Sequence, residues 1–113
     1  MSVKKIFNGQ GTVPSVLVSF DYACTSATQR LDVTATSFPP LPGGATYLKA
    51  TKAQRDLRCD GERHTDFVEW VNYSLDRDVP ARAVLSLYDN SGKLQVPVAE
   101  KTMKPGTGIP PLS

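Results

Sequence analysis

The sequence is poor in residues that build catalytic sites. Among 113 residues there are one histidine and two cysteines, so His64 is the single imidazole base available to a serine or cysteine mechanism. No Gly-x-Ser-x-Gly elbow is present, and both cysteines have a structural role open to them. The sequence therefore predicts a protein that is not an enzyme.

Long apolar runs and charge of one sign are also missing. The longest strongly apolar stretch is VLVSF at 16–20, far short of the roughly 18 residues that a membrane span needs. The formal net charge is +2, and the basic residues are scattered among acids, unlike the basic stripe of nucleic-acid binders. We expect neither membrane insertion nor a nucleic-acid partner.

An export signal is not visible either. The two lysines of MSVKKIF are followed by NGQGT instead of a signal peptide's apolar core. Either a signal was removed or none existed. The two cysteines would pair in an oxidising compartment and remain thiols in a reducing one, so localisation stays open at this point.

What the sequence does contain is strand alternation between turn formers. Nine prolines and eight glycines punctuate the chain, and its length suits one domain. The expected strand segments are 16–24, 31–36, 47–50, 57–59, 64–73 and a hairpin over 80–98 that turns at DNSG. Segment 64–73 has apolar residues on both faces, as in a central strand or one with a bulge. No segment predicts an amphipathic helix. Short strands at near-regular spacing indicate a sandwich or barrel.

Three stretches resemble a known kind of domain. VSFDYACTSATQRLDVTAT, LRCDGERHTDFVEWV and VPARAVLSLYD are similar to small immunoglobulin-like β-sandwich domains of secreted actinobacterial proteins, over roughly residues 13–90. The resemblance implies an all-β, immunoglobulin-like β-sandwich of about seven to eight antiparallel strands, with one disulfide between Cys24 and Cys59. Such a bridge would be worth about 3 to 4 kcal/mol in the chain-entropy account.

The segment CDGERHT at 59–65 has two interpretations. Asp60-Gly61 suits a two-residue hairpin turn, and a strand leaving it would project Glu62, His64 and Asp66 to one face, where a divalent cation could bind. The alternative is a hairpin with solvated acids and an ordinary hydrogen-bonded histidine. No known metal-loop signature matches, so we predict the hairpin, no metal and no cofactor.

Three further features have candidate roles. The proline-rich stretch Phe38, Pro39, Pro40, Leu41 and Pro42 is a candidate interaction loop, although a stiff crossover between sheets is the favoured interpretation. Trp70 is expected in the core, and the alternative is an aromatic glycan platform formed with Phe67 and Tyr73 nearby. Residues 104–113 are expected to form an irregular tail after a single domain at 1–103, with Ile109 and Leu112 as candidate assembly contacts.

These observations predict a non-enzymatic binding or structural module, secreted or displayed at the cell surface. Two alternatives stay open. One is a capsid, decoration or tail protein of a virion or other self-assembly; the other is a small secreted hydrolase inhibitor. In each case a protein partner or self-assembly is favoured over a small molecule, because loops on a rigid scaffold would carry the recognition.

Overall fold

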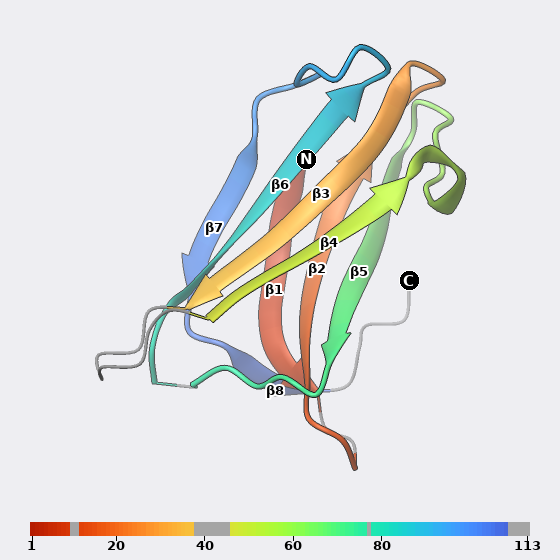
Figure 1. Ribbon diagram of the computed structural model, residues 1–113. Helices are drawn as coiled ribbons and strands as arrows, with labels where there is room; N and C mark the ends of the chain where they lie inside the picture. Colours follow the sequence, from red (N-terminus) through yellow and green to blue (C-terminus); the bar gives the residue numbers. More distant parts are fainter. Residues whose placement is uncertain (10–11, 38–45, 77, 109–113) are drawn as a thin grey trace.

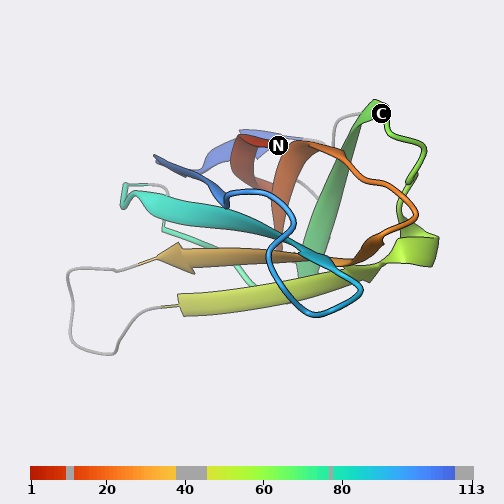
Figure 2. The ribbon, with the colours of Figure 1, turned by 90° about the horizontal axis from the view of Figure 1, so that it is seen from above.

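The structure, a computed structural model, describes residues 1–9, 12–37, 46–76 and 78–108. These residues form eight strands and one short 3₁₀ helix. The elements are β1 (Ser2–Gly9), β2 (Ser15–Ala23), β3 (Thr28–Ser37), β4 (Thr46–Ala53), η1 (Gln54–Asp56), β5 (Arg63–Val71), β6 (Ala81–Asp89), β7 (Ala99–Met103) and β8 (Gly106–Gly108). They build two sheets, ordered β5-β2-β1-β8 and β4-β3-β6-β7 (Figure 1). Seen from above, the sheets lie as two layers (Figure 2), so the prediction of an all-β, two-sheet fold is confirmed.

The core lies between the two layers and follows the predicted alternation. The even positions of β2 from Val16 to Tyr22 face it, as do the odd positions of β3 and β6. The fully buried apolar side chains include Val16, Val18, Phe20, Leu31, Val33, Leu85 and Leu87. Period-two alternation predicts these positions because successive side chains of a strand point to opposite faces.

Strand β1 was not among the predicted strands. Its register with β2 shifts between Val3 and Lys5, at a bulge. The inward side chains Val3 and Ile6 are therefore three positions apart in the sequence instead of two or four. A bulge adds one residue to one strand, and this removes the alternation by which a strand is recognised.

The strand β5 lies at a sheet edge, which corrects the prediction of a central strand. Among the described strands its one neighbour in the sheet is β2, and its Asp66 and Trp70 side chains bond β4 of the other layer. The strand with buried side chains on both faces is β2, since its outward-facing Leu17, Ser19 and Asp21 are also buried. Residues 57–59, predicted as a strand, are not one.

The predicted hairpin at 80–98 forms only in part. β6 and the turn are present, with Gly92 at φ +83° and a bridge between Tyr88 and Leu94. Beyond it, Val96 and Val98 are exposed and lie outside any strand, because Pro97 has no N–H with which to continue the ladder. Pairing with β6 resumes at Ala99.

The chain changes sheets between β7 and β8. β7 pairs with β6 in one sheet, and β8 pairs in parallel with the end of β1 in the other. The expectation of an irregular segment from residue 104 is therefore wrong at Gly106–Gly108. A Gly-Thr-Gly strand has no apolar alternation that could reveal it.

Candidate functional site

Segment 54–62 joins the two sheets, so CDGERHT is not the turn of a hairpin. The strand before it, β4, and the strand after it, β5, belong to opposite layers. Cys59 forms the predicted disulfide with Cys24 at the end of β2, across a sequence separation of 35. Gly61, at φ +82°, donates its N–H to the Cys24 carbonyl at 2.8 Å. The disulfide and this hydrogen bond anchor the crossover to β2.

His64 belongs to a small polar cluster beside the disulfide. Its Nε2 lies 2.9 Å from Asp60 Oδ1, and its ring centroid is 5.9 Å from that of Tyr22. The Tyr22 hydroxyl accepts the N–H of Arg58 at 2.9 Å. The hydrogen bond with His64 holds the pKa of Asp60 below its usual range, although Asp60 is exposed and the interaction is screened by solvent.

The three candidate metal ligands have separate surroundings. His64 bonds Asp60, whereas Asp66 accepts Lys52 Nζ of β4 at 2.9 Å and so links the two layers. Glu62 is exposed. Within the described ranges, no three His, Cys, Asp or Glu side chains gather as metal ligands. That the chain binds no metal stays a prediction.

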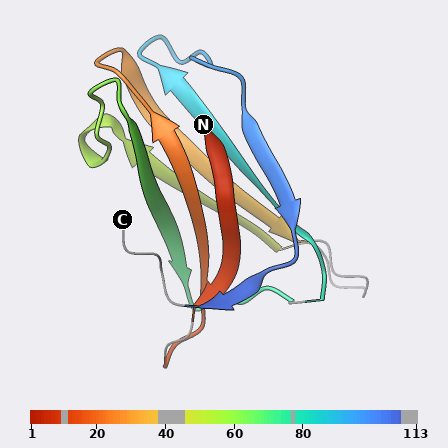
Figure 3. The same ribbon diagram turned by 180° about the vertical axis from the view of Figure 1, so that it is seen from behind.

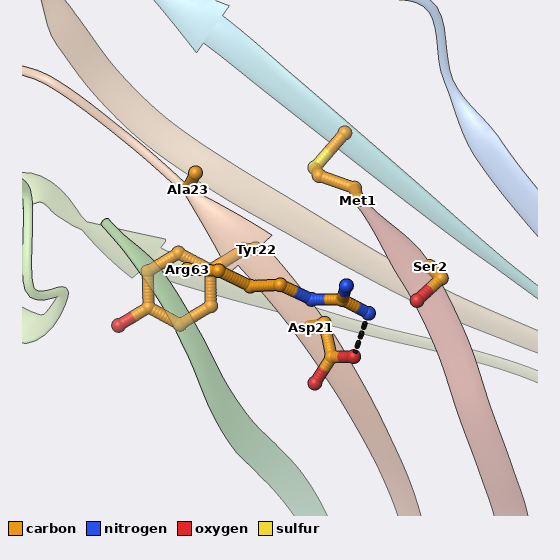
Figure 4. A pocket seen from close by; sticks show the side chains of 6 residues that line it. All are labelled: Met1, Ser2, Asp21, Tyr22, Ala23 and Arg63. Carbon is orange, nitrogen blue, oxygen red and sulfur yellow. Dashed lines mark hydrogen bonds and ion pairs between the residues drawn. The ribbon is translucent and has the colours of Figure 1, made fainter. Parts of the chain in front are cut away.

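A shallow pocket of about 250 Å³ opens where β1 and β5 begin and β2 ends, and is lined by Met1, Ser2, Asp21, Tyr22, Ala23 and Arg63. Arg63 of β5 reaches across to the Asp21 carboxylate (Figure 4). Asp21 also accepts the Thr65 hydroxyl at 2.6 Å, and Lys4 Nζ lies 3.9 Å away. The pocket therefore contains a carboxylate that is already satisfied by its own neighbours.

The electrostatics of Asp21 favour the ionised form. The hydrogen bond from Thr65 lowers the pKa of Asp21 most, burial opposes this, and Arg63 and Lys4 lower the pKa further. Since the Arg63 side chain is 72% exposed, its ion pair contributes little to stability by itself. The hydrogen-bonded carboxylate is a structural group that joins β1, β2 and β5.

Replacing Asp21 with asparagine is expected to lower the free energy of unfolding by about 1 to 2 kcal/mol at neutral pH. The folded-state pKa of Asp21 lies below 3.8, so its contribution is present above about pH 4 and is lost as the pH falls further. The difference in the free energy of unfolding between wild type and Asp21→Asn should therefore shrink as the pH falls below about 4. Urea unfolding at pH values above and below this limit measures it. Glu62→Gln is the matched control. A difference that does not change with pH would contradict the assignment.

Trp70 is neither fully buried, as expected of a core residue, nor exposed, as expected of a glycan platform. It packs against the core while half-buried, and its Nε1–H donates to the Lys49 carbonyl of β4 at 3.1 Å. Together with the Lys52–Asp66 ion pair, this bond closes the flank between β4 and β5. The expected core role is thus modified: Trp70 seals one side of the sandwich.

One end of the sandwich exposes an apolar group of which the sequence indicated only Tyr73, as part of the alternative platform. Val13, Val71 and Tyr73 are 45%, 51% and 49% exposed; we call these three residues the apolar end. The Asn72 N–H donates to the Pro14 carbonyl at 2.7 Å, which holds the two segments together. Asn72 has φ +70°, a left-handed conformation that asparagine tolerates. The sequence did contain one further signal for this exposed group. Val71 follows Trp70 in the same strand, so alternation points its side chain to the other face, away from the core.

Other predicted sites lie outside the described residues. These are the candidate loop Phe38, Pro39, Pro40, Leu41 and Pro42, and the candidate contacts Ile109 and Leu112. In the part of the chain that is described, no helix is long and apolar enough to cross a membrane. Comparison with protein-family models, curated proteins and solved structures finds no match.

Proposed function

We propose that this protein is a non-enzymatic binding module, secreted or displayed at a cell surface, that engages a protein partner through its apolar end. The observation that carries the proposal is the exposure of Val13, Val71 and Tyr73 at adjacent chain segments. Aromatic residues are enriched in protein interfaces, and an apolar centre with a polar rim is their usual anatomy. The rigid β-sandwich beneath would hold this surface in place.

The strand order supports an immunoglobulin-like assignment of the sandwich. In immunoglobulin domains, strand B pairs with E in one sheet and C with F in the other. Here β2 pairs with β5 and β3 with β6, while β7 and β4 flank the second pair as G and C′ would. Two features depart from antibody domains. The disulfide joins the end of the B-like strand to the crossover that precedes the E-like strand, and the tryptophan lies on the E-like strand.

The disulfide supports an oxidising compartment. Disulfides persist in secreted and surface proteins and are rare in the cytosol. Cys24 is 2% exposed, so the bridge is a structural element of the fold and not a surface-exposed thiol pair. Secretion or surface display is consistent with this chemistry.

A photo-crosslinking residue in place of Tyr73 should capture one defined protein partner in the cells that make this protein. The apolar end would be buried in that contact, so the adduct should form at position 73. Tyr47, 62% exposed on β4, is the matched control position and should give no such adduct. Adducts are identified by mass after isolation.

The mass of the adduct also separates the proposal from its alternatives. An adduct of twice the chain mass would favour self-assembly, including the virion alternative. Equal labelling at positions 47 and 73, or none at either, would refute the assignment of the apolar end. The hydrolase-inhibitor alternative rests on Phe38–Pro42, outside the described residues.

A further inference from the structure

Two charged side chains occupy core-facing positions on the strands that border one flank of the sandwich (Figure 3). Lys52 continues the alternation of Leu48 and Ala50 along β4, and Asp66 precedes Val68 in the same way on β5. Lys52 Nζ lies 2.9 Å from Asp66 Oδ2, and the two side chains are 22% and 26% exposed. Because a partly buried ion pair is weak evidence for stability, its place on two strands at the sheet edges calls for another explanation.

The Asp66 carboxylate also bonds the side of β5 that faces away from β2. The Asn72 N–H donates to the carbonyl of Pro14 opposite it, and the pairing of β5 with β2 has no shift in register. Because backbone groups alternate along an antiparallel pair, even-numbered residues of β5 bond β2, and odd-numbered residues direct their N–H and C=O groups away from it. The Phe67 N–H is one of these outward donors, and it bonds Asp66 Oδ1 at 2.8 Å.

We propose that Asp66, together with Lys52, keeps the edge of β5 from pairing with β5 of a second copy of this chain. An edge strand is a template for strand addition, and charges at core-facing edge positions are one way in which proteins prevent it. The nine residues of β5 pair with β2 without a bulge and include no proline or glycine. The backbone of β5 itself therefore has no feature that would interrupt such pairing.

The charges along β5 identify a second copy as the partner. In an antiparallel pair of β5 strands, one register places the exposed Arg63 of each copy opposite the exposed Glu69 of the other. This register also places Thr65 opposite Phe67, and both opposite charges and aromatic–β-branched pairs stabilise a sheet. The same register sets Asp66 directly opposite Asp66, where like charges destabilise it. Asp66 thus opposes the register that the other side chains of β5 favour.

Sedimentation of a full-length variant without the two charges tests the proposal. Lys52→Thr with Asp66→Thr removes both charges, adds no large apolar surface and suits a strand. This variant is expected to sediment with twice the mass of wild type at the same concentration. Arg30→Thr with Asp32→Thr is the matched control, because it removes an ion pair from β3, which has strand neighbours on both sides. The control should sediment like wild type.

Amide hydrogen exchange shows where the two copies meet. The amides of Thr65 and Glu69 face away from β2, so their exchange should slow with rising concentration in the variant and not in wild type.

A second variant, Lys52→Met with Asp66→Leu, replaces the ion pair by apolar side chains, a change that often leaves stability unchanged or higher, and it should associate in the same way. A folded variant that sediments like wild type would overturn the proposal, as would association without slower exchange at Thr65 and Glu69. Loss of the fold in both variants would also overturn it, because the pair would then be a stabilising element. None of these results depends on whether the apolar end binds a partner.

Discussion

Replacing Cys24 and Cys59 together with alanine is expected to lower the free energy of unfolding by about 3 to 4 kcal/mol. The bridge closes a loop with a sequence separation of 35, and opening it restores that conformational entropy to the unfolded chain. Domains of this size have total stabilities of about 5 to 15 kcal/mol, so the bridge is expected to supply a large share of the stability of the fold. Urea unfolding of both proteins measures the difference.

The hydrogen bonds of the crossover allow the disulfide to be tested separately from its surroundings. Gly61 to Cys24 and Arg58 to Tyr22 remain available in the alanine variant, so a folded protein with a shifted midpoint is expected. Wild type treated with a reductant should match the variant, and Ser26→Ala is the control. If the double alanine variant unfolded at the same urea concentration as oxidised wild type, the bridge would not stabilise the fold.

Replacing Phe20 with alanine should destabilise the protein by about 3 to 5 kcal/mol. Phe20 is fully buried in the core, and its ring lies 6.0 Å from that of Tyr22. Alanine would leave a cavity that close-packed strands on both sides of β2 can fill only in part. Thermal or urea unfolding gives the measurement.

Two matched variants make the Phe20 result interpretable. Phe20→Leu retains more of the side-chain volume and should cost clearly less than Phe20→Ala. Tyr73→Ala removes an aromatic ring that is 49% exposed, and should change stability by no more than about 0.5 kcal/mol. If Phe20→Ala and Tyr73→Ala had equal effects, the core placement of β2 would be wrong.

The candidate sites were only partly predictable, because they combine residues distant in the sequence. The disulfide followed from the resemblance and is present. CDGERHT is a crossover, because its flanking strands pair in different sheets, and local turn chemistry does not show which sheet a strand joins. The Asp21 cluster draws on β1, β2 and β5, and nothing near Asp21 in the sequence indicates Thr65 as its partner.

The sequence by itself determined the strands whose side chains alternate without interruption, because period-two alternation is a local property. It placed the even positions of β2 and the odd positions of β6 in one core, and turn residues such as Gly92 marked where a strand ends. Only the tertiary structure decided which strands lie at the edges and that the outward-facing side chains of β2 are buried. Edge position depends on long-range backbone pairing, and the burial of Leu17 depends on segments that meet only when the chain is folded.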